Sequence, residues 1–127
     1  MKVILYIIVI FSTANQLTYA DSTLKDIYEQ ETKKCSTISC IRQKIDQIND
    51  QIIQLLVKRT AYVQRAGDLK LHTKLANDQK RVDDQIEVIG KKSDKLGLPR
   101  GISIEVFKSI IKNSIDFEQQ YIDRLTQ

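Results

Sequence analysis

The sequence is poor in the residues that metal centres and many hydrolytic sites use. Its 127 residues include one histidine, His72, and two cysteines, Cys35 and Cys40, so no metal site is expected. It has no Ser-His-Asp set, no reactive Cys-His pair and no glycine-rich phosphate loop, which argues against hydrolytic and nucleotide chemistry. With one proline, four glycines and no strand pattern, the chain is predicted to form one small all-α domain.

The charge pattern argues against nucleic acid as a partner. The formal net charge is +4, but basic and acidic residues are interleaved, and no run of five or more Lys/Arg residues occurs. Small anions are compatible with this mild basic excess.

Residues 1–20 have the pattern of a secretory signal. Lys2 precedes an apolar run over residues 3–11, and small residues suitable for cleavage end at Ala20. The run is too short for a membrane span, which needs about 20 apolar residues, so a retained anchor is the less favoured alternative. We expect a secreted or periplasmic protein that begins at Asp21 and has no membrane association after cleavage.

Residues 21–40 form a polar N-terminal arm, or a short helix that leads into the domain at residues 41–127. In an exported protein, Cys35 and Cys40 could form a local disulfide that pins the start of the next helix. Free thiols or an intermolecular bridge are the alternatives.

Apolar residues recur every three or four positions along most of the remaining chain. This spacing predicts a very long helix over about 39–72, a second helix over about 78–96 after a polar break, and a third helix from Ser103 to near Leu125. A helix of about 45 to 50 Å is too long to be covered by so small a chain alone. We therefore expect two chains to pair in an intertwined six-helix homodimer.

Two cations lie where the apolar stripe of the long helix should continue. Arg59 and Lys70 are eleven residues apart, which is almost three turns at about 3.6 residues per turn, so both point along one line. Burying them without partners would be strongly unfavourable. Either protein carboxylates or an anionic ligand should therefore lie between them.

The other two helices also carry polar residues on one face. Asp78, Arg81 and Gln85 are spaced three and four apart on the second helix and could converge on one point. Arg81 could equally be a surface residue that pairs with a nearby aspartate. Ser114 and Glu118 lie one turn apart beside the apolar stripe of the third helix, where Glu118 could be a simple flanking carboxylate.

Taken together, three cations and one carboxyl group suit a small ligand with two carboxylates. Arginine binds carboxylates with two parallel hydrogen bonds, and lysine serves as a point donor to a ligand oxygen. This set contains no nucleophile, so electrostatic stabilisation and confinement are the expected means of catalysis.

Five segments, in order, make the chain resemble the all-helical chorismate mutases. The segments are RQKIDQIN at 42–49, LLVKR at 55–59, GDLK at 67–70, DQKR at 78–81 and SIDFE at 114–118. The resemblance covers about residues 41–127 and implies conversion of chorismate to prephenate in a Claisen rearrangement without a cofactor or covalent intermediate.

The resemblance also implies roles for individual residues. Arg59 would bind one carboxylate of the substrate, and Arg42 would reach across the dimer to the other. Lys70 would donate to the ether oxygen whose bond breaks, and Arg81 would hold the ring side of the substrate. Asp78 and Ser114 match supporting polar positions.

Two residues depart from the family pattern. Val82 replaces a glutamate that would contact the substrate hydroxyl, and Gln85, one turn after Arg81, could take that contact. Glu118 stands where many members have glutamine, and a glutamate there must be protonated to donate to the ether oxygen. Val82 best supports the alternative function, a secreted helical interaction protein that has lost activity.

Overall fold

The computed structural model describes residues 22–127, and within them every regular element is helical, as predicted. The predicted signal at residues 1–20 lies outside this range. None of the helices in the described part is both long and apolar enough to span a membrane. The elements are α1 (Leu24–Gln30), a 3-10 turn η1 (Thr32–Lys34), α2 (Ile38–Lys70), α3 (Gln79–Leu96) and α4 (Arg100–Leu125).

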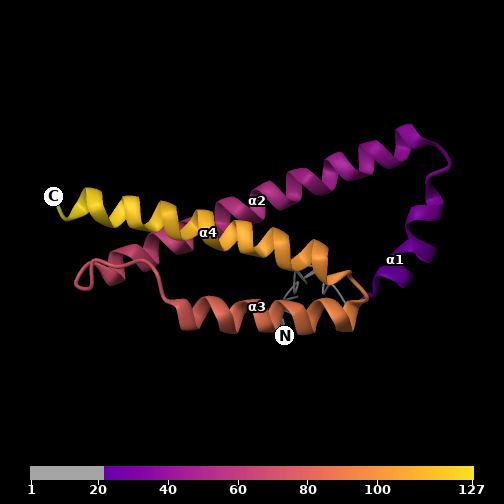
Figure 1. Cartoon of the computed structure of the whole chain (residues 1–127). Helices are drawn as coiled ribbons and strands as arrows, with labels where there is room; N and C mark the ends of the chain where they lie inside the picture. The colour runs from indigo at the N-terminus through magenta and orange to yellow at the C-terminus, as the bar shows by residue number, and fades with distance from the viewer. Residues whose placement is uncertain (1–21) are drawn as a thin grey trace, which may run out of the picture.

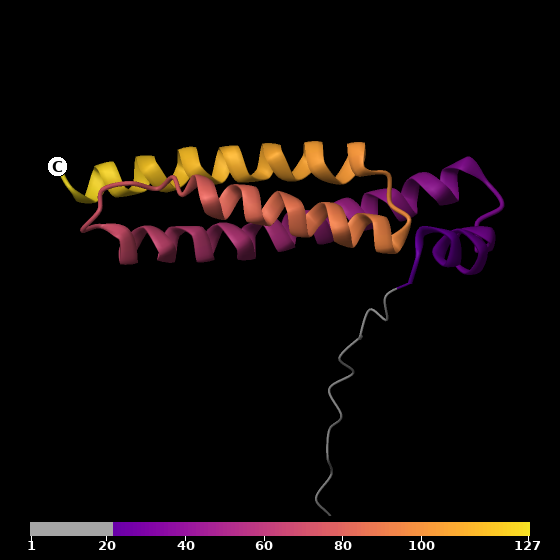
Figure 2. The same ribbon diagram turned by 60° about the horizontal axis from the view of Figure 1, so that its bottom comes forward.

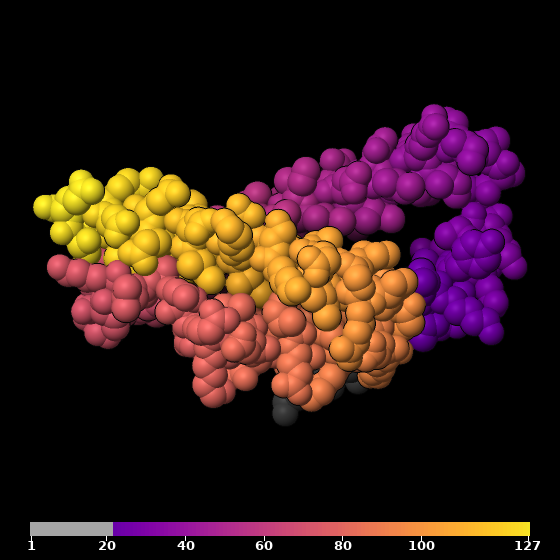
Figure 3. Space-filling view, in the orientation of Figure 1, coloured from indigo at the N-terminus to yellow at the C-terminus, as the bar shows by residue number. Residues whose placement is uncertain are grey.

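Helix α4 is the central element of the bundle. It packs against both α2 and α3. Helix α3 runs antiparallel to α2 and to α4 (Figures 1 and 2). Only the C-terminal half of α2 takes part in this packing. The N-terminal half of α2 stands clear of α4, with open space between them in the space-filling view (Figure 3).

The helix ends follow from local side-chain chemistry. The hydroxyl of Thr37 accepts a hydrogen bond from the backbone N–H of Cys40 and so caps the start of α2. The carboxylate of Asp78 does the same for α3 by accepting from the N–H of Arg81 at 3.0 Å. Gly97 ends α3 with a positive φ of 70°, a conformation that glycine adopts without steric cost.

The predicted start of the third helix at Ser103 was wrong. Helix α4 begins three residues earlier, at Arg100, directly after Pro99. Pro99 is the residue before the first turn, and its carbonyl accepts from the backbone N–H groups of Ile102 and Ser103 at 3.0 and 3.4 Å. Ser103 is instead buried, and its hydroxyl lies 2.6 Å from that of Ser93 on α3.

Residues 22–40 include the short helix α1 and the turn η1, so the alternative of a short helix leading into the domain describes this segment better than a polar arm. Thr23 and Asp26 form a capping box at the start of α1. The structure joins Cys35 and Cys40 by a disulfide with a Cα–Cα distance of 5.5 Å. This bond ties the segment that follows α1 to the first turn of α2.

The apolar core of the described chain is small. Ile111, Ile122 and Ala76 are buried, whereas Ile45 and Ile48 on the N-terminal half of α2 are 50% and 52% exposed. Burying apolar surface is the dominant favourable term in folding and in most protein association. Together with exposed Ile38 and Ile52, Ile45 and Ile48 form an apolar stripe along this half of α2, and exposed apolar surface of this kind is typical of interaction surfaces.

Gly67 permits a close approach between α2 and α4. A Cβ atom at this position would lie 3.0 Å from Tyr121 Cδ1 and 3.5 Å from Glu118 Cγ. We expect Gly67→Ala to lower the free energy of unfolding by about 1–3 kcal/mol, because the aromatic ring must shift in a packed interface.

The matched control is Gly101→Ala in α4, where a Cβ would meet nothing within 4 Å. This change is expected to be neutral or to stabilise by up to about 1 kcal/mol, through helix propensity. Urea unfolding of both variants measures the difference. Equal effects at the two positions would contradict the close approach at Gly67.

Candidate functional site

Arg59 extends from α2 to the facing side of α4. Its Nη1 donates a hydrogen bond to Ser114 Oγ, and the same hydroxyl donates to the carbonyl of Ile110 at 2.7 Å. Arg59 is only half-buried, and within residues 22–127 no carboxylate forms an ion pair with it. Its positive charge is therefore available to an anionic ligand.

Lys70 also reaches α4, from the last turn of α2. Its Nζ lies 3.0 Å from Glu118 Oε1 and donates to the carbonyl of Ala76 at 3.0 Å. The Glu118 side chain is 7% exposed, and Oε1 receives no well-directed hydrogen bond from any described residue. The Lys70 ammonium is close enough for an ion pair with this buried oxygen, so the carboxyl group has a charged partner within the described chain.

The head groups of these two cations converge. Along α2, Arg59 and Lys70 are separated by eleven residues, or roughly 16 Å at about 1.5 Å per residue. Their partners on α4, Ser114 and Glu118, are only one turn apart, or about 6 Å. The Arg59 side chain must therefore lean toward the C-terminal end of α2, and the Lys70 side chain must lean back toward Arg59.

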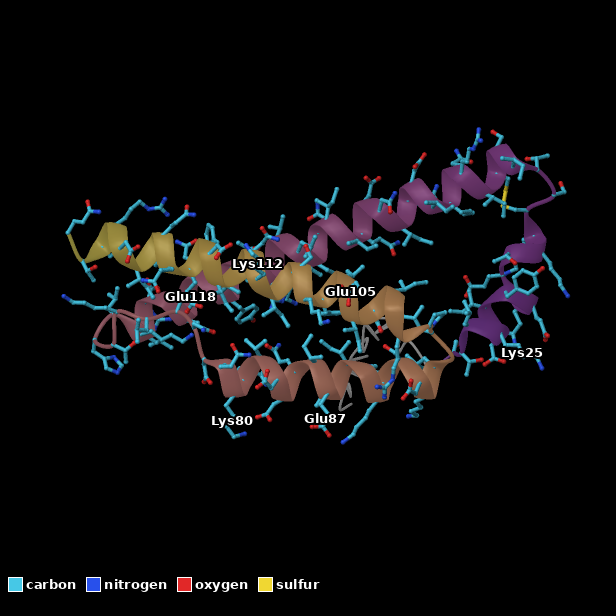
Figure 4. The ribbon with its side chains drawn as sticks, viewed as in Figure 1. Lys25, Lys80, Glu87, Glu105, Lys112 and Glu118 are labelled. Carbon is cyan, nitrogen blue, oxygen red and sulfur yellow. A yellow bond between two sulfur atoms is a disulfide. The ribbon has the colours of Figure 1, made fainter. Side chains whose placement is uncertain are left out.

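A cleft of about 320 Å³ opens between α2 and α4 beside Arg59 and Ser114. Figure 4 shows Glu118 where α4 crosses the C-terminal half of α2, whereas Lys80 and Glu87 project from the side of α3 away from α4. The cleft is mostly apolar apart from a few polar groups, as is usual for a small-molecule site. Its lining residues are Leu56, Arg59, Thr60, Val63, Ser109, Ile110, Asn113, Ser114 and Phe117.

The predicted polar face of the second helix is only partly assembled. The carboxylate of Asp78 caps α3 through the backbone N–H of Arg81 rather than contacting the Arg81 side chain. Arg81 is exposed in the first turn of α3, and no ion pair to it is found in the described chain. Gln85 and Val82 are half-buried on the inward side of the same helix.

Arg42 is too far from this cleft to serve it. It is exposed and lies seventeen residues before Arg59 on one continuous helix, a separation of about 25 Å. Arg42 can therefore act only at a site formed elsewhere, such as one on a second copy of the chain.

Several residues that support the site were missed in the sequence. Ala76 is buried in the α2–α3 loop and is held by Gln119 of α4, whose Oε1 accepts from the Ala76 N–H at 3.0 Å. Tyr121 Oη donates to Asp68 Oδ1 at 2.6 Å, beside Gly67. The only sequence signal for these contacts was Gly67, a single glycine within a long helix.

The Tyr121 hydrogen bond, with a smaller contribution from Arg65, lowers the pKa of Asp68 below its usual value of 3.8. A lowered pKa in the folded state means that this contact stabilises the fold above the ordinary pKa of aspartate. The stabilisation is lost as the pH falls through the lowered value. The contact between α2 and α4 is therefore intact at mildly acid pH.

The arrangement offers binding and electrostatic chemistry. Arg59 lines the small cleft, and Lys70 with the buried Glu118 carboxyl group lies one turn farther along α4, a set suited to an anionic ligand whose oxygens accept hydrogen bonds. Within residues 22–127, no group of three or more His, Cys, Asp or Glu side chains is placed to hold a metal ion.

Comparison with protein families gives one match. The sequence model of the family described as chorismate mutase type II matches residues 41–119, which is more than half of the chain and includes Arg42, Arg59, Lys70, Arg81 and Glu118. Comparison with curated proteins and with solved structures found no match.

Proposed function

The chain belongs to the chorismate mutase type II family, and on that premise we propose that it converts chorismate to prephenate. In this rearrangement the ether C–O bond to the ring breaks while a new C–C bond forms between the side chain and the ring of the same molecule. No group leaves the substrate, and no electrons are exchanged with the protein. The site needs only to bind, orient and stabilise developing charge.

One observation carries this proposal: the convergence of Arg59 and Lys70 on one turn of α4 that holds a buried carboxyl group. In our proposal, the Arg59 guanidinium binds a substrate carboxylate beside the Ser114 hydroxyl. The Lys70 ammonium donates to the ether oxygen, where negative charge develops as the bond breaks. Donors already in place at that oxygen lower the barrier without reorganising.

The proposal includes a homodimer. The exposed apolar stripe on the N-terminal half of α2 would pack against a second copy, which would also bring Arg42 to the neighbouring cleft. There Arg42 would bind the second substrate carboxylate. The length of α2 supports this arrangement, because Arg42 cannot reach the cleft of its own chain.

Helix α3 would close the site over the ring of the substrate. Arg81 is exposed and is not tied to any carboxylate in the described chain, so its side chain is free to turn toward a ligand. Gln85 is on the inward side and would contact the substrate hydroxyl in place of the glutamate that Val82 replaces. Asp78 would support Arg81 by fixing the first turn of α3.

Glu118 would donate the second hydrogen bond to the ether oxygen, which only the protonated carboxyl can do. We therefore expect Glu118→Gln to keep at least the wild-type turnover and Glu118→Leu to lower it by about 10²-fold, because an amide can donate this hydrogen bond and a leucine side chain cannot. The charged group nearest Glu118 is Lys70, at 3.0 Å.

Initial rates of the two variants and of the wild-type protein test the idea. Circular dichroism of each protein serves as the folding control. Equal rates in Glu118→Gln and Glu118→Leu would remove Glu118 as the donor.

The experiment that tests the function is the loss of chorismate absorbance with the purified protein at neutral and mildly acid pH. Turnover that depends on Arg59 supports the proposal. A folded dimer without turnover at either pH would instead favour an exported helical interaction protein. Half-buried Val82, in place of a polar contact, is the observation that favours this second function.

We also propose that the protein acts outside the cytoplasm, either secreted or periplasmic. The signal-like pattern of residues 1–20 and the disulfide between Cys35 and Cys40 support this location, because disulfides persist in oxidising compartments. Accumulation of a shorter chain in the medium or periplasm of an expressing cell, beginning at Asp21, would test it.

A further inference from the structure

One side chain holds the loop between α2 and α3 against α4. Gln119 Oε1 accepts from the backbone N–H of Ala76 at 3.0 Å, and Gln119 Nε2 donates to the carbonyl of Lys74 at 3.1 Å. Nε2 also donates to Asp123 Oδ1 at 2.9 Å. Ala76 is 3% exposed, so its N–H group needs a partner from within the protein.

The same buried residue contacts Lys70. The carbonyl of Ala76 accepts a hydrogen bond from Lys70 Nζ at 3.0 Å, the same distance at which Nζ approaches Glu118 Oε1. Two consecutive residues of α4 therefore determine where the two oxygen atoms beside the Lys70 ammonium lie. Glu118 supplies one directly, and Gln119 places the other through Ala76.

Neighbouring groups have to fix the direction in which a lysine side chain points. Its ammonium is a point charge at the end of a flexible four-carbon chain, unlike the planar fork of arginine. The Lys70 side chain is 36% exposed, so packing alone does not fix it. The Ala76 carbonyl accepts one hydrogen bond from the ammonium and the Glu118 carboxylate attracts it from another side, so the position of the head group is fixed while other N–H groups stay available to a ligand oxygen.

We propose that Gln119 is a positioning residue for Lys70, because it fixes Ala76 and thereby aims the ammonium at the reacting oxygen of the substrate. This inference rests on the proposed function, since it concerns how Lys70 acts there. The side-chain amide suits this role because one planar group accepts from the N–H of Ala76 and donates to the carbonyl of Lys74.

The test compares Gln119→Leu with Gln120→Leu in the full chain. Gln120 is the exposed neighbour on α4 and provides a control of the same type. We expect Gln119→Leu to lower kcat by up to about 10²-fold with little change in KM, because a misplaced donor weakens an interaction made mainly in the transition state. Gln120→Leu should leave both constants unchanged.

A double-mutant cycle separates positioning from general damage to the fold. In a Lys70→Ala background, Gln119→Leu should cause no further loss, since the residue through which it acts is already gone. An equal fold-loss in the two backgrounds would overturn the proposal. Gln119→Glu is a second variant of nearly the same shape, and it should lower kcat because a carboxylate faces the Lys74 carbonyl and Asp123 unfavourably.

A readout without substrate keeps the inference apart from the proposed function. In the ¹⁵N spectrum of lysine side chains, the Lys70 ammonium should be protected from solvent exchange in the wild-type protein and in Gln120→Leu, and unprotected in Gln119→Leu. Protection that persists in Gln119→Leu would refute the positioning role. Absence of turnover in the wild-type protein would refute the proposed function and leave this spectral test valid.

Discussion

Replacing Arg59 by alanine is expected to lower kcat/KM for chorismate by about 10²–10³-fold, the usual effect of removing one charged donor from a preorganised site. The fold should survive, because Ser114 keeps its hydrogen bond to the carbonyl of Ile110 when the guanidinium is removed. No described carboxylate loses an ion-pair partner in this variant. The loss should therefore appear in turnover and not in the unfolding midpoint.

Arg65→Ala is the matched control for this change. Arg65 lies on the same helix six residues later, with a side chain that is 64% exposed and pairs only with Asp68 at 3.3 Å. Exposed pairs of this kind contribute about 0–1 kcal/mol to stability, so both activity and fold should be preserved. If the two arginine variants lost activity equally, the cleft beside Arg59 would not be the reactive site.

A mixture of two inactive variants is expected to recover about a quarter of wild-type activity. Arg42→Ala and Arg59→Ala would each disable every site in its own homodimer. If Arg42 serves the neighbouring cleft, random exchange of subunits makes half of the dimers mixed, and each mixed dimer has one intact site of two. Turnover would rise from near background to about 25% of the wild-type rate.

The mixing experiment requires unfolding and refolding of the two chains together, with separately refolded chains as the control. Size-exclusion chromatography with light scattering establishes the dimer. A dimer without recovered activity would show that Arg42 does not serve the neighbouring cleft. A monomer with full activity would contradict the role of the exposed stripe on α2, including Ile45 and Ile48.

Helix periodicity predicted which polar residues lie on the faces that pack, but not which of them meet. It placed Arg59, Lys70, Ser114 and Glu118 in line with apolar positions, because the period of about 3.6 residues fixes the face of a helix. The contacts of Arg59 with Ser114 and of Lys70 with Glu118 form where α2 and α4 pack, whereas Arg81, grouped with them from the sequence, is exposed. Periodicity also gave the ends of α2 and α3 to within two residues.

Elements whose form depends on local chemistry were predicted less well. Asp78 was assigned to a binding face, but its carboxylate caps α3, a role that an aspartate directly before a helix commonly takes. The start of α4 was placed at Ser103 because serine is a good cap, whereas the helix begins at Arg100 and Pro99 is the residue whose carbonyl accepts the first backbone hydrogen bonds. Both competing signals were present in the sequence.

The loop contacts could not be predicted from periodicity. Residues 71–78 have no repeating pattern, and Lys74 adopts a positive φ of 56°, which is uncommon for a residue with a side chain. The position of Ala76 depends on this turn and on Gln119, 43 residues later. Such a contact is fixed only when the whole bundle has formed.

The uninterrupted course of α2 limits how the length of the chain can change. Each residue of an α-helix turns the chain by about 100°, so inserting or deleting one residue between Arg42 and Arg59 would rotate one arginine away from the other. Point substitutions on the exposed side of α2 leave that angle intact. Insertions should therefore be tolerated in the turn between α3 and α4, and selected against along the 33 residues of α2.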